Sequence, residues 1–371
     1  MPIFSVPESL RTWAEVDLGA LRANLDFVRQ RIGPSPTILA IVKANGYGHG
    51  ARETVQALTR DKTIFGVANL YEASEIKSVS DGSDVMLLGP CLPAERNAAV
   101  ENDHIVTVSS AMEAKAFAAF GKTRINFKID TGMGRVGCWK DTAISEFKSI
   151  REISGIEIHS ISTHLPSADE DIAFTTHQLD GFTKLAQKLR ELAPKAKIHS
   201  LNSAGILTLP EFAGDIVRPG LMLYGCSPIA RFSNSLKPVL AWKARIVLLK
   251  DLPAGAGVSY GRTYISSTPI RTAVIPVGYA DGYPRQASGK GVGVLINGKR
   301  CDIIGRITMD QIIVNITDLT NVQVGDVATL IGGDGNVSID AQELADKSGT
   351  IAWDILTGIG RRVERFYSEA P

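Results

Sequence analysis

The first two-thirds of the chain repeats one unit, a short β-branched run followed by an amphipathic segment. Several runs are apolar on both faces, as strands buried in a parallel sheet are. They cover residues 37–43, 63–69, 84–89, 104–110, 124–130, 156–162, 196–201 and 214–225. Segments between them, such as 111–120 and 177–192, place apolar residues three and four apart, which predicts helices. About eight such units predict an α/β fold, a (β/α)8 TIM barrel, although a doubly wound open sheet would give a similar string.

The pattern changes after Lys237 and Pro238. Short apolar runs then follow one another with turns between them, and residues 297–299 (Asn-Gly-Lys) form a strong hairpin signal. One helix is predicted near the end, over 340–349. We therefore expect a barrel over residues 14–237, followed by a mainly antiparallel β domain over 238–371. Residues 1–13 are expected to pack with this second domain, and the strand predicted at 13–18 could pair with it.

Charge and hydropathy exclude several classes of protein. The 40 lysines and arginines are balanced by 39 acidic residues, so no basic excess is available to hold a nucleic acid. No run approaches the roughly 18 apolar residues of a membrane span, and the N-terminus lacks the features of a signal peptide. The four cysteines lack the paired spacing of zinc sites. We expect a cytoplasmic protein with no metal, membrane or nucleic-acid partner.

Polar residues gather where the predicted strands end. In a parallel barrel, catalytic groups lie at the carboxyl ends of the strands. The residues found there are Lys43, Lys128, Asp130, His164, Asn202, Ser203 and Arg218. A hydrophobic scaffold does not require so many polar groups at one end, so the sequence predicts a site there.

Lys43 is the first candidate for chemistry. A lysine that ends a buried strand loses solvation, which favours its neutral amine, and a neutral amine can attack an aldehyde to form an imine. The plainer interpretation is an ammonium that reaches past the strand end into water. A glycine-rich loop with Tyr47 and His49 follows directly and favours the functional interpretation.

The other motifs each have a plain structural alternative. Residues 132–137 (GMGRVG) match a dinucleotide-binding fingerprint, but Glu152 lies before the next strand rather than at its end, so a dehydrogenase is disfavoured. Ser203 and Gly220 are candidates for phosphate contacts, or simply a helix cap and a turn. His164 could be a hydrogen-bonded core histidine. Three loops of the β domain, 257–264, 278–285 and 308–311, carry phenolic and charged groups typical of a surface that closes over a ligand.

The motifs, taken in order, resemble those of the alanine racemases. The strings are AIVKANGYGHG (40–50), FKIDTGMGRVG (127–137), THLPSAD (163–169), NSAG (202–205), RPG with LYG (218–225), SYGRTY (259–264), GYADGYPR (278–285) and GRITMDQ (305–311). Each string is a weak pattern, but their ordered combination is highly specific. The resemblance runs from about Trp13 to Asp354.

This resemblance implies a homodimer with shared active sites that uses pyridoxal 5'-phosphate (PLP) to interconvert L- and D-alanine, supplying D-alanine for peptidoglycan. Lys43 matches the lysine that holds PLP, and Tyr260 of a second copy matches the second catalytic base. Arg218 matches the arginine facing the pyridine nitrogen, oriented by His199. The remaining cofactor-binding positions are Tyr47, His164, Asn202, Ser203, Gly220 and Leu221.

The resemblance also assigns substrate contacts. Arg135 and the second copy's Met309 fall on the site for the substrate carboxylate, and Tyr279 and Asp310 match residues that line the access path. Lys128 matches a lysine that is carbamylated in many members and then supports Arg135; a plain lysine or a bound chloride are the alternatives. Many members place a tyrosine near the C-terminus against the cofactor phosphate, whereas this chain has ILTGIGRRV (355–363) there.

The expected groups suit a racemase. Two acid–base groups on opposite faces, Lys43 and Tyr260, meet the need to remove a proton from one face and deliver one to the other. A free phenol has a pKa near ~10, so Tyr260 needs a neighbouring cation or donor. Arg218 can only donate hydrogen bonds, so the ring nitrogen would stay unprotonated and side reactions such as transamination would be fewer.

Other functions remain open. A serine or broad-specificity racemase is the closest alternative. A PLP-carrier protein is typically a barrel alone, and a PLP decarboxylase would be expected to place an acidic residue, rather than Arg218, at the ring nitrogen.

Overall fold

The computed structural model describes residues 6–59 and 63–369 and divides into two compact units. The barrel unit comprises Arg22–Gly46 and Ala51–Leu236. The C-terminal unit comprises the chain up to Leu21, the short segment Tyr47–Gly50 and the chain from Lys237 onward. This division differs from the expected boundary at residue 14, because residues 14–21 lie with the C-terminal unit. The predicted packing of residues 1–5 lies outside the described residues.

Eight parallel strands form the barrel unit. In spatial order they are β10 (Ile216–Val217), β2 (Thr37–Ile41), β3 (Ile64–Val67), β4 (Val85–Leu87), β5 (Ile105–Val108), β6 (Thr123–Asp130), β8 (Ile156–Ser162) and β9 (Lys197–His199). Backbone hydrogen bonds join the last strand to the first: Asp215 N donates to Ile198 O (2.8 Å) and Arg218 N to Leu201 O (2.9 Å). The sheet therefore closes, which confirms the (β/α)8 prediction over the open sheet.

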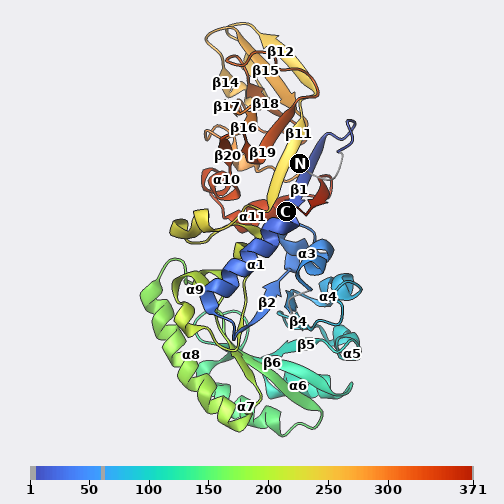
Figure 1. Cartoon of the computed structure of the whole chain (residues 1–371), viewed down its shortest axis with the longest axis vertical. Helices are drawn as coiled ribbons and strands as arrows, with labels where there is room; N and C mark the ends of the chain where they lie inside the picture. Colours follow the sequence, from blue (N-terminus) through green and yellow to red (C-terminus); the bar gives the residue numbers. More distant parts are fainter. Residues whose placement is uncertain (1–5, 60–62, 370–371) are drawn as a thin grey trace. The chain divides into compact units, whose positions relative to one another are not determined.

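Helices surround these strands (Figure 1). They are α1 (Leu18–Ile32), α3 (Ala51–Leu58), α4 (Leu70–Lys77), α5 (Arg96–Glu101), α6 (Ala111–Ala118), α7 (Ala143–Arg151), α8 (Ile172–Leu192) and α9 (Ser203–Thr208). Side chains define where several begin: Asn69, Ser110, Asp171 and Asn202 each accept a hydrogen bond from the backbone N–H three residues later. All four residues of β3 and of β5 are buried, as expected for strands covered by helices on one face and barrel interior on the other.

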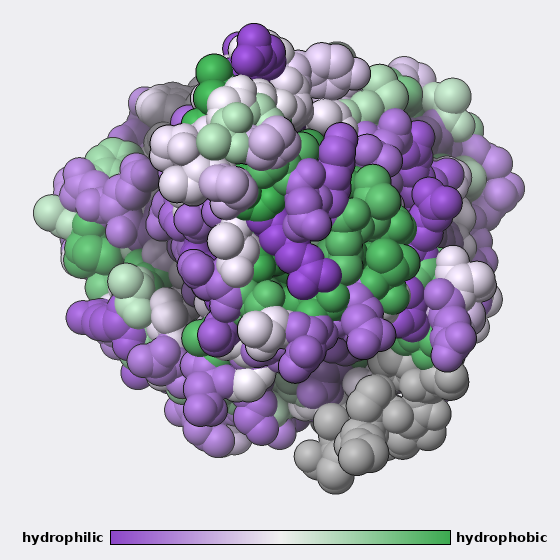
Figure 2. Space-filling view, turned by 90° about the horizontal axis from the view of Figure 1, so that it is seen from above, coloured by the Kyte–Doolittle hydropathy of each residue, from purple (hydrophilic) through white to green (hydrophobic). Residues whose placement is uncertain are grey.

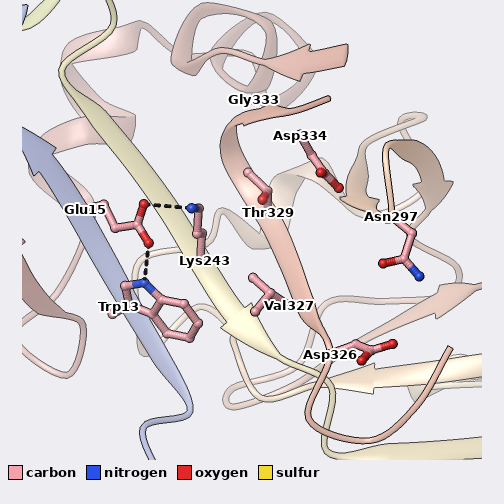
Figure 3. Close-up of a pocket in the computed structure, with 9 residues that line it drawn as sticks. All are labelled: Trp13, Glu15, Lys243, Asn297, Asp326, Val327, Thr329, Gly333 and Asp334. Carbon is pink, nitrogen blue, oxygen red and sulfur yellow. Dashed lines mark hydrogen bonds and ion pairs between the residues drawn. The ribbon is translucent and has the colours of Figure 1, made fainter. Parts of the chain in front are cut away.

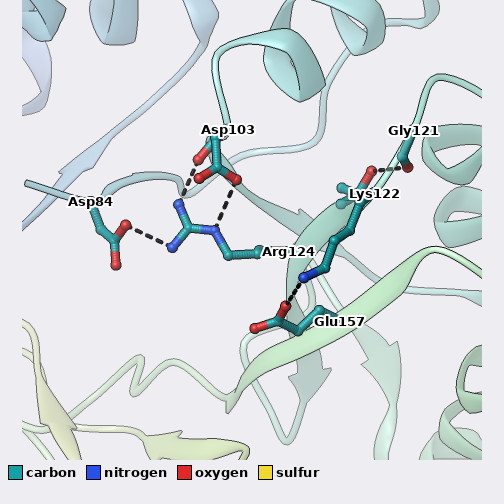
Figure 4. A network of polar contacts seen from close by, with 7 residues as sticks. Asp84, Asp103, Gly121, Lys122, Arg124 and Glu157 are labelled. Atoms are coloured by element: carbon teal, nitrogen blue, oxygen red, sulfur yellow. Dashed lines mark hydrogen bonds and ion pairs between the residues drawn. The ribbon is translucent and has the colours of Figure 1, made fainter. Parts of the chain in front are cut away.

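Ion pairs cover the amino end of the barrel (Figure 4). Arg124, at the start of β6, binds the Asp84 carboxylate (2.7 Å) and the Asp103 carboxylate (3.1 Å), and these two acids precede β4 and β5. The Arg124 guanidinium also donates to the Asp103 carbonyl (2.6 Å). Lys122 and Glu157 make a more exposed pair (3.0 Å). These contacts tie neighbouring strands together where they begin.

The C-terminal unit is mainly antiparallel, as predicted. Its main sheet has the order β17 (Lys299–Asp302), β16 (Gly293–Ile296), β19 (Val327–Asp334), β11 (Leu240–Arg245), β1 (Thr12–Asp17) and β21 (Glu364–Ser368), with β20 (Val337–Ile339) beside β19. A second sheet contains β12 (Leu248–Leu252), β15 (Ile270–Ile275) and β18 (Ile312–Asn315), and β13 (Gly257–Val258) pairs with β14 (Tyr264–Ile265). The N-terminal strand β1 pairs with both β11 and β21.

Local signals account for several elements of this unit. Asn297 and Gly298 both have positive φ (50° and 73°), which gives the two-residue turn of the β16–β17 hairpin. The predicted helix at 340–349 is α10 (Ala341–Ser348), capped by Asp340 and ended by the left-handed Gly349. A further helix, α11 (Ala352–Gly358), was not predicted. Among the described residues, no helix combines the length and apolar character needed to cross a membrane.

Candidate active site

Lys43 stands at the carboxyl end of β2 and opens one left-handed turn, labelled α2 (Lys43–Tyr47). Ala44, Asn45 and Tyr47 have φ of 51°, 54° and 52°. Each residue with a side chain in this conformation costs about 1–2 kcal/mol. The Glu72 carboxylate holds the turn, because it accepts from Ala44 N (2.8 Å) and from Ala68 N (2.7 Å). Strain retained in this way beside a half-buried lysine is typical of functional sites.

Cations surround Lys43 at this end of the barrel. Burial, followed by the charge of Arg135, lowers the pKa of Lys43, and Glu72 opposes this only in part. Burial lowers the pKa of Lys128 well below its usual value, with Arg218 and Arg135 adding to the effect. The predicted neutral amine at Lys43 is thus favoured by its surroundings. The guanidinium charges of Arg135, which acts on both lysines, and of Arg218, which acts on Lys128, suit anionic ligands.

Arg218 is buried and points its guanidinium along the barrel interior. Its Nη1 lies 2.8 Å from His199 Nδ1, and its Nη2 donates to the carbonyls of Thr163 (2.8 Å) and Ser200 (2.6 Å). Burial, and then the charge of Arg218, lowers the pKa of His164 to about 2. His164 is therefore neutral at physiological pH and lies beside Arg218, with Nδ1 3.5 Å from Nη2.

Ser203 and Gly220 meet although 17 residues separate them. The Ser203 hydroxyl oxygen accepts from Gly220 N (2.9 Å) and from Met222 N (3.4 Å). Asn202 caps α9 by accepting from Gly205 N (2.9 Å), so Ser203 begins the helix rather than capping it. Leu221 follows in the 3-10 helix η5 (Leu221–Tyr224). Asn202, and not Ser203, is thus the helix cap. The Ser203 hydroxyl instead binds the backbone of the loop after β10.

The GMGRVG loop has a structural reason of its own. The Asp130 carboxylate accepts from the backbone N–H groups of Gly132 (2.9 Å), Met133 (2.9 Å) and Arg135 (3.0 Å). A Cβ on Gly137 would lie 2.7 Å from Asp130 N, so no larger residue fits there. The loop leads into the short strand β7 (Cys138–Trp139), not into a helix that opens on the glycines. The match to the dinucleotide-binding fingerprint is therefore coincidental. The Asp130 carboxylate fixes the backbone of the loop that carries Arg135.

Tyr260, in the C-terminal unit, lies on a strained loop. Ser259, Gly261 and Arg262 around it all have positive φ (59°, 71° and 48°). The Ser259 hydroxyl donates to Arg306 O (2.6 Å), which anchors the loop. Tyr260 is 69% exposed. Figure 2 shows one face of the molecule, on which hydrophobic residues lie among hydrophilic ones. A large exposed aromatic side chain on a held loop is suited to contact a second molecule.

Tyr279, Met309 and Asp310 come together in the same unit. Tyr279 N donates to Thr308 O (3.1 Å) and Ala280 N to Met309 O (3.0 Å), so loops 278–285 and 308–311 are joined. A Cβ on Gly278 would lie 2.3 Å from Met309 O, which explains the glycine. Met309 and Tyr279 are exposed (50% and 43%). Asp310 binds Arg362 (2.6 Å).

Trp353 is a neighbour of Tyr47 that the sequence analysis missed. The C-terminal unit includes both residues, and the Trp353 side chain is hydrogen-bonded to that of Tyr47. Burial raises the Tyr47 pKa to about 12, so its hydroxyl keeps its proton as a donor. A Cβ on Gly48 would lie 2.2 Å from Leu356 O of α11, so the loop and this helix are closely packed. Trp353 lies two residues before the segment 355–363, in which this chain lacks the C-terminal tyrosine of many family members. An aromatic residue just upstream of that segment was the signal in the sequence that could have identified it.

A polar recess of about 330 Å³ lies elsewhere in the C-terminal unit (Figure 3). Its lining residues are Trp13, Glu15, Lys243, Asn297, Asp326, Val327, Thr329, Gly333 and Asp334. Glu15 pairs with Lys243 (2.7 Å) and accepts from the Trp13 indole (3.0 Å), so these groups satisfy one another. None of the predicted site residues lines it.

Comparison with known proteins gives a consistent result. The N-terminal domain model of alanine racemase matches residues 16–228, and the C-terminal domain model matches residues 239–367. An alanine racemase of Halothermothrix orenii is 40% identical over 366 residues, 96% of each chain. One of Methylacidiphilum infernorum is 40% identical over 372 residues, covering 99% of this chain and 95% of that one.

Solved structures agree. The alanine racemase of Clostridium difficile 630 has a TM-score of 0.91 at 32% identity, covering 97% of this chain and 96% of its own. That of Bartonella henselae, solved with covalently bound pyridoxal phosphate, has a TM-score of 0.88 at 30% identity, covering 96% and 99%.

A closed barrel with a desolvated lysine after its first strand, together with an antiparallel β domain, defines the class of barrel-type amino-acid racemases. The chain belongs to the alanine racemase family. This confirms the resemblance found in the sequence.

Proposed function

We propose that this chain interconverts L-alanine and D-alanine, using PLP held covalently by Lys43. The observation that carries the proposal is Lys43 itself, whose pKa is lowered by burial and by Arg135 at the carboxyl end of β2. A neutral amine there is ready to form an imine. The bound cofactor supplies an electron-withdrawing ring that makes the α-proton of an amino acid removable.

The residues fit a phosphorylated pyridine. The guanidinium groups of Arg135 and Arg218 act on His164, and their positive charge suits a phosphate and a substrate carboxylate. We assign the phosphate to Ser203, to the backbone of Gly220 and Leu221, and to the Tyr47 hydroxyl. In this assignment Asn202 positions Ser203, and Trp353 orients Tyr47.

Two groups on opposite faces of the substrate would move the proton. We assign Lys43 Nζ to one face and the Tyr260 hydroxyl of a second copy to the other. Arg135 and the second copy's Met309 bind the substrate carboxylate, and Tyr279 and Asp310 line the access path. This arrangement requires a homodimer with shared sites, and the exposure of Tyr260 and Met309 supports it.

Arg218 tunes the ring. A guanidinium does not give up its proton, so facing the pyridine nitrogen it would only donate, and that nitrogen would stay unprotonated. His199 and two backbone carbonyls hold the guanidinium in place. The weaker electron withdrawal favours racemisation over transamination.

Lys128 is proposed to be carbamylated. Its lowered pKa supports this, because only a neutral amine adds carbon dioxide, with loss of one proton. The resulting anion would attract Arg135 instead of repelling it. Nuclear magnetic resonance with ¹³C-bicarbonate tests for the carbamate carbon. If no carbamate signal depends on Lys128, the modification is rejected.

The relatives' activity supports a place in the supply of D-alanine for peptidoglycan, in the cytoplasm. The test is a chirality assay of purified protein with L-alanine and then L-serine, with and without added PLP. Borohydride reduction followed by peptide mass mapping should place the reduced cofactor on Lys43. A cofactor-saturated protein without this adduct would contradict the proposal.

Tyr260→Phe tests the second base. We expect the two reaction directions to be impaired through different proton-transfer steps, which solvent isotope effects measured in each direction would reveal. Full activity with unchanged isotope effects in both directions would reject the two-base assignment.

A further inference from the structure

A row of buried polar side chains crosses the barrel interior, where such barrels usually hold Val, Ile and Leu. Thr107 on β5, Asn126 on β6, Ser160 on β8 and His199 on β9 are each at most 3% exposed, and the row ends at Arg218 after β10. Buried polar groups are unfavourable unless hydrogen-bonded. Hydrogen bonds join these five side chains across five neighbouring strands.

The hydrogen bonds in this row run in one direction. Arg218 is always a donor, so the His199 Nδ1 that lies 2.8 Å from it must accept. His199 is therefore the neutral tautomer with its proton on Nε2. That nitrogen lies 3.2 Å from Asn126 Oδ1, to which it donates.

The Asn126 amide is fixed from its other side. Its Nδ2 donates to Thr107 Oγ1 (3.0 Å), and the Thr107 hydroxyl in turn donates to the carbonyl of Leu87 (2.7 Å). Because that proton is committed, the Thr107 oxygen can only accept. The Ser160 hydroxyl also donates to Asn126 Oδ1 (3.1 Å). A flipped Asn126 amide would place its Nδ2 donor against the His199 and Ser160 donors, and its Oδ1 acceptor against the accepting Thr107 oxygen.

We propose that Asn126 is a positioning residue for Arg218: it holds His199 in the Nε2–H tautomer, whose bare Nδ1 accepts the Arg218 guanidinium. The consequence for the reaction rests on the proposed function, in which Arg218 faces the cofactor ring. The hydrogen-bond chain itself does not depend on that function.

Protonation of His199 would break this chain, because an imidazolium presents a second donor and a positive charge to Arg218. The ionisable groups that act on His199 are Arg218, Lys128 and His159, and together with burial they keep its pKa well below the usual value. Arg218 and His159 lower the pKa of His199, as does Lys128 while its amine is unmodified, whereas a carboxylate placed at Asn126 would raise it.

The first test is the tautomer of His199 in the holoenzyme. The chain has six histidines, so ¹⁵N-histidine labelling gives a resolvable spectrum, with His199→Gln to assign the signal. We expect a protonated Nε2 and a bare Nδ1 from about pH 6 to about pH 9. An Nδ1–H tautomer, or a titration within that range, would overturn the proposal.

The second test is Asn126→Asp, which keeps an oxygen toward His199 but adds a negative charge. We expect the His199 signal to titrate in the accessible range. Below that new pKa, kcat should fall about tenfold per pH unit relative to wild type.

Ser160→Ala is the matched control, because it removes a donor to the same Asn126 oxygen without changing charge. It should leave the pH profile of kcat unchanged. Identical pH profiles of kcat for Asn126→Asp and wild type would reject the proposal. If the variant does not fold, the His199 tautomer in the wild-type protein still tests the proposal. If the wild-type protein has no racemase activity but His199 shows the Nε2–H signal, the proposed function is rejected, while the positioning of Arg218 by Asn126 through His199 is supported.

Discussion

The two ends of the barrel carry charge in opposite ways. At the amino end, Arg124 is neutralised by two carboxylates, from Asp84 and Asp103. At the carboxyl end, burial and then basic groups, Arg218 first among them, lower the pKa of His164, and the Asp130 carboxylate accepts hydrogen bonds from backbone amides. Paired charges stabilise the fold, whereas basic groups that nearby carboxylates balance only in part prepare a site for an anionic ligand.

The largest expected effect is at the carboxyl end. Lys43→Ala should reduce racemisation by about a thousandfold or more, because both the imine and one proton acceptor are lost. The stability of the cofactor-free protein should not fall, since a partly desolvated amine is removed. A chirality assay and urea unfolding measure the two quantities. Lys122→Ala, at the amino end, is the control and should keep full activity; similar rates for the two variants would remove the contrast between the ends.

Arg218→Glu should change the reaction outcome. A carboxylic acid can protonate the ring nitrogen, so transamination should rise relative to racemisation on the order of tenfold, or about 1.4 kcal/mol between the two barriers. Pyruvate formation, measured against chirality change, gives the ratio. Arg218→Lys retains a cationic donor and should shift the ratio less. An unchanged ratio in the glutamate variant counts against the role of Arg218.

Arg124→Gln should lower the free energy of unfolding without slowing the reaction. The Arg124 side chain is 19% exposed and serves two carboxylates, so its loss should destabilise by about 2 kcal/mol. Lys122→Gln breaks the exposed pair with Glu157, whose side chains are 77% and 50% exposed, and should cost less than about 1 kcal/mol. Urea unfolding compares the two variants. Equal losses in the free energy of unfolding would show that the contacts of Arg124 with two carboxylates stabilise the fold no more than the exposed pair does.

His159, among the amino-end charges, should make the fold sensitive to acid. Burial, and then Lys197, lowers its pKa to about 4, below the unfolded value near ~6.5. The unfolded chain therefore binds the proton first, and stability falls as pH drops from about 6.5 toward 4. His159→Gln should regain up to about 2 kcal/mol at pH ~5 relative to pH ~7.5. The exposed His177→Gln is the control, and parallel stability curves for both variants would refute the assignment.

The smallest effect concerns the left-handed turn after Lys43. Ala44→Gly removes the Cβ from a residue at φ 51° and should raise the free energy of unfolding by up to about 1 kcal/mol, partly offset by chain entropy. Ala57→Gly within α3 should instead destabilise by about 1 kcal/mol or more. Thermal unfolding distinguishes them. A destabilised Ala44→Gly would mean that the turn stores no strain.

Much of the fold was readable from the sequence because its signals are local. The eight barrel strands lie where β-branched runs predicted them, α1 spans the predicted segment, and Asn297-Gly298 makes the predicted hairpin. The ordered motifs gave the family. The left-handed turn was not foreseen, because Ala44 and Tyr47 carry side chains that ordinarily avoid positive φ.

The sequence by itself determined the period of the strands, the turn and cap residues, and which polar side chains end the barrel strands, since each depends on neighbours in the chain. Only the tertiary structure decided that β1 joins the sheet of the C-terminal unit, that Trp353 contacts Tyr47, and that Asn126 serves Arg218 through His199. The pairing of Trp13 with Glu364 in these sheets joins residues 351 positions apart, and a hydrogen bond or a desolvated charge is defined by what surrounds it in space.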